Sequence, residues 1–326
     1  MIGKILLANL PTKISKLERL SKEWGVNLYI KRDDQTGSEI SGNKIRKLEY
    51  LLKIALDNNC DTLITTGGIQ SNHCRATAAA ATLLGLKCEL LLRVGDLPKV
   101  EGNYFLDKLF GAGINFCNAD EYRDSRDEIM RVIGERLEKE SGRRCFIIPE
   151  GASNGVGSLG YYEAMNEILT QEREYGVRFE SIVVAVGSGG TYSGLCTANK
   201  EMNLGKRVIG FAVASDSEYF VNKIHILNNE AADIAGFKSE FSRNDIEIID
   251  KYIGEGYAIS RPEELRFIAD IASKEALILD PVYTGKAMYG LYNEIKEGNV
   301  PQGSNLLFIH TGGIFGLFPK QDQFIF

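Results

Sequence analysis

Histidines, cysteine pairs and long apolar runs are scarce in this sequence of 326 residues, and each scarcity argues against a class of protein. The three histidines are His73, His225 and His310, and none has the spacing of metal ligands, so we predict no metal site. The six cysteines form no CxxC pair, which indicates free thiols rather than a disulfide framework or a zinc site.

Basic clusters and membrane-length segments are also missing. The formal net charge is −6 and no block of Lys and Arg is present, which argues against nucleic acid as a partner. The N-terminal apolar stretch, residues 5–10, is too short for a secretory core. The alanine-rich stretch 76–86 is far shorter than the ~20 apolar residues of a membrane span. We therefore predict a cytoplasmic protein with no membrane partner.

Three enzyme motifs are absent or broken. The phosphate loop GxxxxGK[ST] of nucleotide-binding proteins is missing, and so is the GxSxG of serine hydrolases. The stretch "GSGGTYSG" at 187–194 resembles a dinucleotide fingerprint, but Tyr192 stands at its last glycine position. A nicotinamide-dependent oxidoreductase is thus a remote alternative.

Short β-branched or apolar runs alternate with stretches of helical periodicity. This order predicts an α/β fold with mostly parallel twisted sheets covered by helices on both faces. The expected strands lie in 61–68, 88–96, 181–191, 206–215 and 305–313, and two expected helices in 69–86 and 192–202.

Four turns rich in small polar residues follow expected strands, at 67–73, 151–157, 187–194 and 310–313. In open α/β sheets ligands bind beyond the carboxyl ends of the strands, so these turns are expected to line one cleft. The glycines of 187–194 allow backbone N–H groups to approach an anion at a helix N-terminus. A packing turn is the alternative, but a cofactor monophosphate fits better.

Lys44 lies where an amphipathic helix is expected to begin. Apolar residues recur at three- and four-residue spacing at Ile45, Leu48, Leu52 and Ala55, which leaves Lys47, Glu49 and Lys53 to face water. Lys44 could be a solvated charge, but the positive end of the helix dipole disfavours one there. Partial burial would lower its pKa and favour attack on an aldehyde. A phosphate loop with such a lysine suggests pyridoxal phosphate.

Six segments, in order, resemble the family of D-cysteine desulfhydrases and 1-aminocyclopropane-1-carboxylate (ACC) deaminases, fold-type II pyridoxal-phosphate enzymes related to the β-subunit of tryptophan synthase. The segments are "KRDDQTGSEISGNKIRKLEYLL", "TTGGIQSNHCRATA", "GNYFLDKLFGA", "AVGSGGTYSG", "LDPVYTGKAMYGL" and "FIHTGGIFGLF". The resemblance covers about residues 8–318. It implies a homodimer and two lobes: a small one at 46–155 inserted into a large cofactor-binding one made of 1–45 and 156–326.

The resemblance also implies roles for individual residues. Lys44 would hold the cofactor covalently, and Gly187, Ser188, Gly189, Gly190 and Thr191 would bind its phosphate. Asn72 would contact the cofactor's phenolic oxygen, and Ser71 with Asn72 and His73 would bind the substrate carboxylate, although Ser71 and Asn72 alone could be plain helix caps. Tyr283 would pack on the pyridine ring, with Tyr257 as a second active-site tyrosine.

Two positions bear on the reaction. ACC deaminases carry a glutamate and a leucine where this sequence has Thr284 and Thr311, the hydroxyl residues of the desulfhydrases. A glutamate would protonate the pyridine nitrogen and strengthen the electron sink, and threonines would not. The resemblance therefore implies a lyase acting on a small amino acid, most simply D-cysteine to pyruvate, hydrogen sulfide and ammonia.

Three departures from the family pattern touch the substrate side: Ser41, "YAIS" at 257–260 and "GGIFG" at 312–316. They leave open ACC deamination and elimination from L-cysteate, L-cysteine or a D-serine derivative. A protein that binds pyridoxal phosphate without catalysis is a remote alternative.

Overall fold

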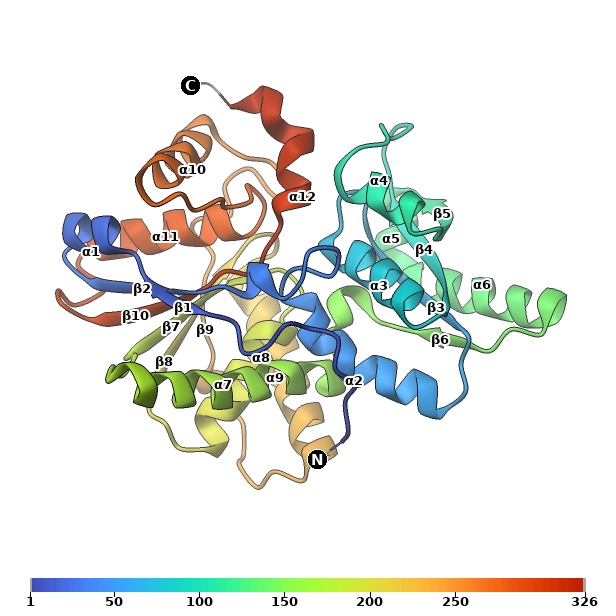
Figure 1. Ribbon diagram of the computed structural model, residues 1–326, viewed down its shortest axis with the longest axis horizontal. Coiled ribbons are helices and arrows are strands. Elements are labelled where there is room, and N and C mark those ends of the chain that lie inside the picture. Colours follow the sequence, from blue (N-terminus) through green and yellow to red (C-terminus); the bar gives the residue numbers. More distant parts are fainter. Residues whose placement is uncertain (1, 325–326) are drawn as a thin grey trace.

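The computed structural model describes residues 2–324 as two twisted sheets with helices on both faces, joined side by side (Figure 1). The six-stranded sheet has the order β1-β2-β10-β7-β8-β9 and the four-stranded sheet the order β5-β4-β3-β6. Among the strands described in residues 2–324, only β1 and β2 pair antiparallel, with Ile14 opposite Lys31, and the other pairings are parallel. The predicted α/β fold with mostly parallel sheets is confirmed.

The strands of the larger sheet come from both ends of the chain: β1 (Ile14–Lys16), β2 (Asn27–Lys31), β7 (Ser181–Val186), β8 (Arg207–Ala212), β9 (Glu247–Ile249) and β10 (Asn305–Ile309). Its helices are α1 (Glu18–Trp24), α7 (Gly155–Tyr175), α8 (Gly190–Glu201), α9 (Ser217–Ala235), α10 (Pro262–Glu275), α11 (Thr284–Lys296) and α12 (Ile314–Leu317). The expected strands in 181–191, 206–215 and 305–313 and the helix in 192–202 are confirmed in type.

The smaller sheet consists of β3 (Thr62–Gly68), β4 (Lys87–Arg93), β5 (Gly113–Cys117) and β6 (Cys145–Ile147). Around it lie α2 (Lys44–Asp57), α3 (Asn72–Leu83), α4 (Gly102–Leu109), α5 (Ala119–Asp124) and α6 (Arg126–Ser141). Short 3₁₀ turns occur at Asp33–Gln35, Glu150–Ala152, Arg243–Asp245 and Phe318–Gln323. All four strands of this sheet fall inside the expected small lobe; the lobe boundaries at 46 and 155 stay a prediction.

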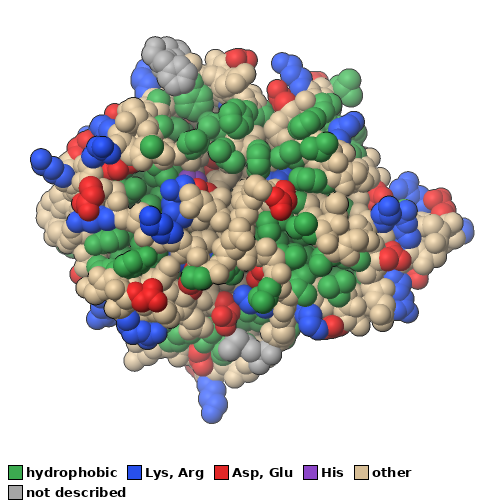
Figure 2. All heavy atoms as spheres, viewed as in Figure 1, with side chains coloured by type: hydrophobic (Ala, Val, Ile, Leu, Met, Phe, Trp, Pro, Cys, Tyr) green, Lys and Arg blue, Asp and Glu red, His purple; other side chains and the backbone are tan. Residues whose placement is uncertain are grey.

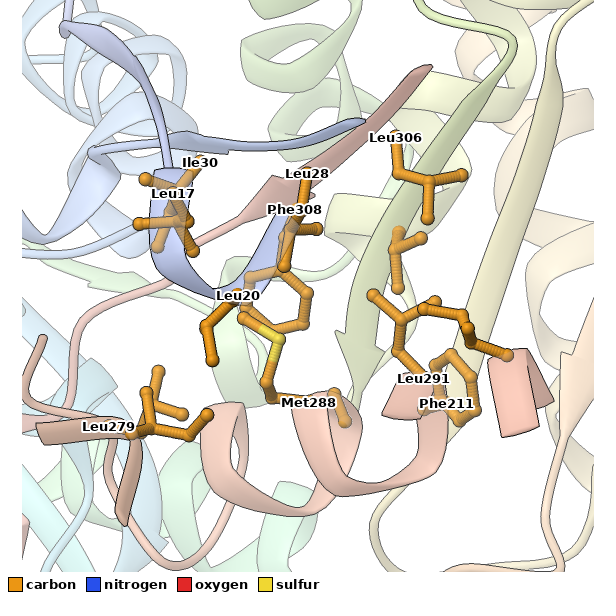
Figure 3. Close-up of a cluster of buried hydrophobic side chains, with 14 of the residues drawn as sticks. Leu17, Leu20, Leu28, Ile30, Phe211, Leu279, Met288, Leu291, Leu306 and Phe308 are labelled. Carbon is orange, nitrogen blue, oxygen red and sulfur yellow. The ribbon is translucent and has the colours of Figure 1, made fainter. Parts of the chain in front are cut away.

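Alternation along the central strands divides the core of the larger sheet into two layers. Leu306 and Phe308 of β10 lie in one cluster with Leu20 of α1 and with Met288 and Leu291 of α11 (Figure 3). Leu307 and Ile309 pack on the α7 and α8 side. Both layers are fully buried, so these strands read as continuous apolar runs rather than alternating ones. Burying each such side chain stabilises the fold by about 1.5–3 kcal/mol.

Helix α2 leads from the larger sheet to the smaller one and is buried on several faces. Its apolar residues Ile45, Leu48, Leu52 and Ala55 are all fully buried, as the spacing predicted. Lys47 and Glu49, however, are also fully buried, so the expectation that they face water was wrong. The N-terminal segment covers Glu49, whose Oε1 accepts hydrogen bonds from the N–H groups of Leu7 and Ala8 at 2.8 Å.

A buried polar network fixes the start of α2 against its neighbours. The Arg46 guanidinium donates to Asp33 at 2.8 and 2.9 Å, and to Glu167 of α7 at 2.9 Å. Lys31 of β2 donates to Glu167 at 2.5 Å and to the carbonyl oxygen of Thr12 at 3.0 Å. Burial alone would raise the pKa of Asp33, but Arg46 and Lys31 hold it at about 2, so the carboxylate stays charged.

Candidate active site

A cavity of about 190 Å³ lies where the carboxyl ends of strands from both sheets meet. The lining residues follow β3, β4, β6, β7, β8 and β10, together with the start of α2. Each of the four turns expected to form a cleft contributes at least one lining residue. The site therefore lies in the position that open α/β sheets use for ligands.

Most of the residues predicted for the site line this cavity. They are Lys44, Ser71, Asn72, His73, Gly187, Ser188, Gly189, Thr191, Tyr257, Tyr283 and Thr311. Two predicted residues, Gly190 and Thr284, do not line it. Asn43, Arg93, Tyr122, Glu150 and Lys223 line it too, although the sequence did not single them out.

Lys44 is the first residue of α2, as predicted, and its amine points into the cavity beside an aromatic ring. Its Nζ donates to Oδ1 of Asn43 at 3.2 Å and lies 5.7 Å from the centroid of the Tyr283 ring. Burial lowers the pKa of Lys44 to about 8, although Glu150 and Asp280 act in the opposite direction. About a tenth of the amine is therefore uncharged at pH 7, far more than for an ordinary lysine, and this form can attack an aldehyde.

The glycine-rich loop between β7 and α8 follows the backbone path of an anion-binding turn. Gly189 has a φ of +92°, a conformation that glycine adopts without strain. A Cβ at Gly187 would lie 2.8 Å from the Tyr283 ring, so the glycine lets the tyrosine lie against the loop. The loop is tied to the start of α2 because Asn43 Nδ2 donates to Thr191 Oγ1 at 2.9 Å.

Lys47, behind the loop, is a further residue that sequence reasoning missed. Its Nζ donates to Ser153 Oγ at 2.9 Å and lies 3.1 Å from the position of a Cβ at Gly190, directly behind the loop. Burial lowers the pKa of Lys47 well below its ordinary value, and the positive charge of the nearby Lys44 lowers it further. Lys47 follows Lys44 by three positions and so lies near it on the helix, but the sequence did not show that this part of the helix is covered.

The N-terminus of α3 presents backbone donors to the cavity. Ser71 caps the helix, and its Oγ accepts from the N–H of Cys74 at 3.1 Å. Asn72 Oδ1 accepts from Asn103 Nδ2 at 2.9 Å. The N–H groups of Asn72 and His73 lie in the first turn, where no intrahelical acceptor exists. Those two donors and the helix dipole suit a carboxylate.

The His73 side chain is turned away from such an anion. Its Nε2 lies 2.7 Å from Thr65 Oγ1, whose proton goes to the carbonyl oxygen of Ile148 at 2.8 Å. Nε2 must then be the protonated nitrogen, which leaves the buried Nδ1 as a bare acceptor. Burial, with the nearby Lys44, lowers the pKa of His73 well below its usual value, so the ring stays neutral. His73 can offer a carboxylate its backbone N–H only.

Two tyrosines form a hydrogen-bonded pair at one wall. The hydroxyl oxygens of Tyr257 and Tyr283 are 2.6 Å apart. Burial raises the pKa of Tyr257 to about 12 and that of Tyr283 well above its usual value. Both phenols are therefore protonated near neutral pH and can donate or relay a proton.

Thr284 is engaged elsewhere. Its Oγ1 donates to Asp280 Oδ1 at 2.7 Å and accepts from the N–H of Asp280 at 2.8 Å, which closes the turn before α11. Of the two predicted hydroxyl residues, only Thr311 lines the cavity. Thr284 therefore supports the loop that carries Tyr283, and the structure does not bring its hydroxyl to the site.

A family model described as "Pyridoxal-phosphate dependent enzyme" matches residues 5–312 of the chain. The protein belongs to this family. This membership confirms the expected cofactor, and the predicted resemblance to desulfhydrases and ACC deaminases is confirmed by the relatives.

Among the relatives of this pyridoxal-phosphate dependent enzyme is a bifunctional D-cysteine desulfhydrase/1-aminocyclopropane-1-carboxylate deaminase of Arabidopsis thaliana. It is 43% identical over 97% of this chain and 80% of its own length. A D-cysteine desulfhydrase of Salmonella newport is 38% identical over 97% of this chain and 95% of its own length. The crystal structure of an ACC deaminase homologue, 41% identical, superposes with a TM-score of 0.89 over 98% of this chain and 94% of that one.

The residues present fit pyridoxal phosphate. The loop after β7 has no side chains at Gly187, Gly189 and Gly190, and Lys47 behind it has no carboxylate partner among residues 2–324. A phosphate dianion would supply the missing counter-charge. The amine of Lys44, with its lowered pKa, lies 5.7 Å from the centroid of the Tyr283 ring. The donor set thus matches a phosphorylated aromatic aldehyde.

Proposed function

We propose that the protein is a lyase that catalyses α,β-elimination from a β-thiol amino acid, most simply D-cysteine to pyruvate, hydrogen sulfide and ammonia. The observation that carries the proposal is the Lys44 amine, which has a pKa of about 8 and lies near the Tyr283 ring in a cavity that a glycine-rich loop also lines. The D-cysteine desulfhydrases among the relatives support the choice of substrate.

In this proposal Lys44 holds the cofactor covalently, and the Gly187–Thr191 loop with Lys47 holds its phosphate. Thr311 offers a neutral hydroxyl to the pyridine nitrogen, and Tyr283 packs beside the ring. Glu150 is the one carboxylate among the lining residues, and its Oε2 lies 3.9 Å from Nη1 of Arg126. A neutral partner for the pyridine nitrogen favours rapid loss of a good leaving group over reactions that need a long-lived carbanion.

Pyridoxal phosphate, when bound, supplies the electron sink that makes the substrate's Cα–H bond acidic. Ser71 and the N–H groups of Asn72 and His73 orient the substrate through its carboxylate, which fixes the direction of that bond. Lys44, freed as an uncharged amine, takes the α-proton. The Tyr257 and Tyr283 hydroxyls, 2.6 Å apart, relay protons at the same wall.

Replacing Lys44 with alanine tests the proposal. The variant should fold, lack the yellow colour of the bound cofactor and lose at least about 100-fold in turnover, since it loses both the attachment point and the base. Lys53→Ala, on the same helix and paired with Asp57 at 2.5 Å, is the control. Mass spectrometry after borohydride reduction should find the cofactor on Lys44. Normal sulfide release from the Lys44→Ala protein would disprove the assignment.

A substrate screen separates the reactions that the fold allows. D-cysteine, L-cysteine, L-cysteate and ACC are incubated with the holoenzyme, and keto acid and sulfide are measured. We expect sulfide and pyruvate from D-cysteine and no turnover of ACC, because the Thr311 hydroxyl, which we propose to face the pyridine nitrogen, cannot protonate it as a glutamate would. The bifunctional Arabidopsis relative makes ACC deamination the second candidate. Keto acid from ACC alone would favour it.

We also propose a cytoplasmic homodimer. The six cysteines are all free, which fits a reducing compartment. None of the helices described between residues 2 and 324 has the length and hydropathy that crossing a membrane requires. Hydrophobic side chains gather on one face over α4 and α12 (Figure 2), and Phe105, Leu109 and Phe318 there are each about half exposed or more. Light scattering should give twice the 36.1 kDa chain mass.

A further inference from the structure

Arg93 lies at the edge of the cavity, at the end of β4. The parallel register pairs it with Gly68 of β3, in the turn that leads to α3. Arg93 lines the cavity, and a Cβ at Gly68 would lie 3.8 Å from its Nη2. The guanidinium therefore lies within van der Waals distance of the turn that leads to the N-terminus of α3.

The Arg93 guanidinium is held by two aromatic rings and by no anion. Its Cζ lies 5.0 Å from the centroid of the Tyr122 ring and 5.7 Å from that of Tyr257. Within residues 2–324 no hydrogen bond or ion pair occupies its five N–H donors. Stacking fixes the direction of the side chain and leaves its donors free.

The other cation beside Tyr122 is neutralised. Arg126 lies 5.2 Å from the centroid of the same ring, and its Nη1 lies 3.9 Å from Glu150 Oε2. Its Nε also lies 3.8 Å from Asp127. Arg126 is not among the lining residues. Arg93 thus carries the unpaired positive charge on this side of the cavity.

If the proposed function holds, the cofactor and substrate together carry three anionic groups: the phosphate, the α-carboxylate and the substituent on the substrate's Cβ. The phosphate has the Gly187–Thr191 loop and Lys47, and the α-carboxylate has Ser71 with the N–H groups of α3. Tyr257 lies between these groups and Arg93, since it contacts the guanidinium on one side and hydrogen-bonds Tyr283 on the other. The group left for Arg93 is the substituent on the substrate's Cβ.

We propose that Arg93 is a specificity-determining residue that binds a negatively charged substituent on Cβ, such as a thiolate or sulfonate. This inference rests on the proposed function. In the elimination the α-proton passes to the base, its electron pair forms the Cα=Cβ bond, and the Cβ–S bond breaks with both electrons on sulfur. Arg93 donates N–H hydrogen bonds to that sulfur or to its oxygens, before and during the break.

Arg93→Gln and Arg93→Lys test the proposal in the holoenzyme. Each amino acid is supplied as the enantiomer that the wild type uses. In Arg93→Gln, kcat/KM for cysteine and cysteate should fall about 10- to 100-fold, the loss expected when a hydrogen bond to a charged group is removed. For 3-chloroalanine, whose substituent is neutral, it should change no more than about threefold. Arg93→Lys should recover part of the loss, and Arg126→Gln should leave all three values near wild type.

Binding gives a second readout that needs no turnover. Aspartate and asparagine have nearly the same shape, but only aspartate carries a charge on its Cβ substituent. Calorimetry should show that the wild type prefers aspartate and that Arg93→Gln loses this preference, with the cofactor absorbance spectrum unchanged. An equal loss for cysteine and 3-chloroalanine would instead assign Arg93 to the α-carboxylate and overturn the proposal. An unchanged aspartate preference in Arg93→Gln would also overturn it.

The two proposals fail in different ways. If the wild type eliminates none of the substrates, the proposed function is wrong, and the aspartate and asparagine measurement still tests Arg93. If the wild type releases sulfide from cysteine but the Arg93 variants keep its substrate preference, only the role of Arg93 is wrong.

Discussion

Replacing Lys47 with methionine should have opposite effects on the cofactor-free protein and on the holoenzyme. Lys47 is fully buried, its Nζ donates to Ser153, and no carboxylate among residues 2–324 pairs with it. Burial and the neighbouring Lys44 lower its pKa well below the ordinary value, so the fold bears the cost of removing this proton or of burying the charge. A phosphate dianion at the loop would reverse that cost.

The expected changes in stability and in cofactor affinity can be estimated separately for the cofactor-free protein and the holoenzyme. Replacing buried ion pairs by apolar residues of similar volume often stabilises proteins, by about 1–4 kcal/mol, and we expect a gain of this order for cofactor-free Lys47→Met because the lysine has no compensating carboxylate in the described part of the chain. A hydrogen bond to a charged partner contributes about 1.5–3 kcal/mol, so cofactor affinity should fall about 10- to 150-fold. The variant thus gains stability and loses affinity.

The pH dependence has a definite sign. Between the folded pKa of Lys47 and its ordinary value of 10.5, the unfolded chain holds a proton that the folded protein lacks. Wild-type stability therefore rises with pH in this window, by up to about 1.4 kcal/mol per pH unit from this group. Lys47→Met lacks the contribution, so its advantage over the wild type should shrink as the pH rises.

Urea unfolding of the cofactor-free proteins and absorbance titration with pyridoxal phosphate measure both quantities. Lys53→Met, which removes a partly exposed lysine of the same helix, should change neither by more than about 1 kcal/mol. Unchanged cofactor affinity in Lys47→Met would refute the assignment of Lys47 to the phosphate. A loss of stability in the cofactor-free variant would refute the reasoning about burial.

Two further predictions concern α2 and its anchor. The rate at which the cofactor attaches to the cofactor-free protein should rise about tenfold per pH unit below pH 8 and level off above it. Burial lowers the pKa of Lys44 to about 8, and only the uncharged amine attacks the aldehyde. Stopped-flow absorbance measures this rate, and a rate that does not change with pH would contradict the prediction. Asp33→Asn should lower the free energy of unfolding in urea by about 3–5 kcal/mol, because Arg46 loses its buried carboxylate, whereas Asp34→Asn should cost at most about 1 kcal/mol. Burial opposes ionisation of Asp33, but Arg46 holds its pKa at about 2. The stability that the charged Asp33 contributes should therefore be lost as the pH falls from 3.8 toward 2. If Asp33→Asn lost as much stability over this pH range as the wild type, the role of Asp33 would be contradicted.

The sequence predicted the parts of the fold and site that depend on short-range pattern. Runs such as 61–68 and 181–191 became β3 and β7 because β-branched residues ending at glycines specify a strand and its turn. The cleft followed from the rule that parallel strands present their carboxyl ends at one edge. Lys44 could be placed because it precedes the first apolar residue of α2.

The features that the sequence missed depend on contacts between distant segments. Lys47 was expected to face water because the apolar stripe of α2 marks one buried face, but α2 lies between two sheets and is covered on several sides. His73 was expected to bind the substrate carboxylate, and the sequence did not show that its ring is turned toward Thr65 of β3, which leaves the backbone N–H for that role. Arg93 gave no signal by itself, since its position depends on Tyr122 and Tyr257.

The distribution of charge links folding to ligand binding. The chain has a net charge of −6, yet the lining residues include Lys44, Arg93 and Lys223 against the single carboxylate of Glu150, with Lys47 directly behind the loop. Burial lowers the pKa values of Lys44 and Lys47, and repulsion by Lys44 and Lys223 lowers that of Lys47 further. Anionic ligands remove that repulsion, so the cations that destabilise the cofactor-free protein stabilise the complex. Mutations that neutralise them should therefore trade affinity for stability, with Lys47 the strongest case because it is the most deeply buried.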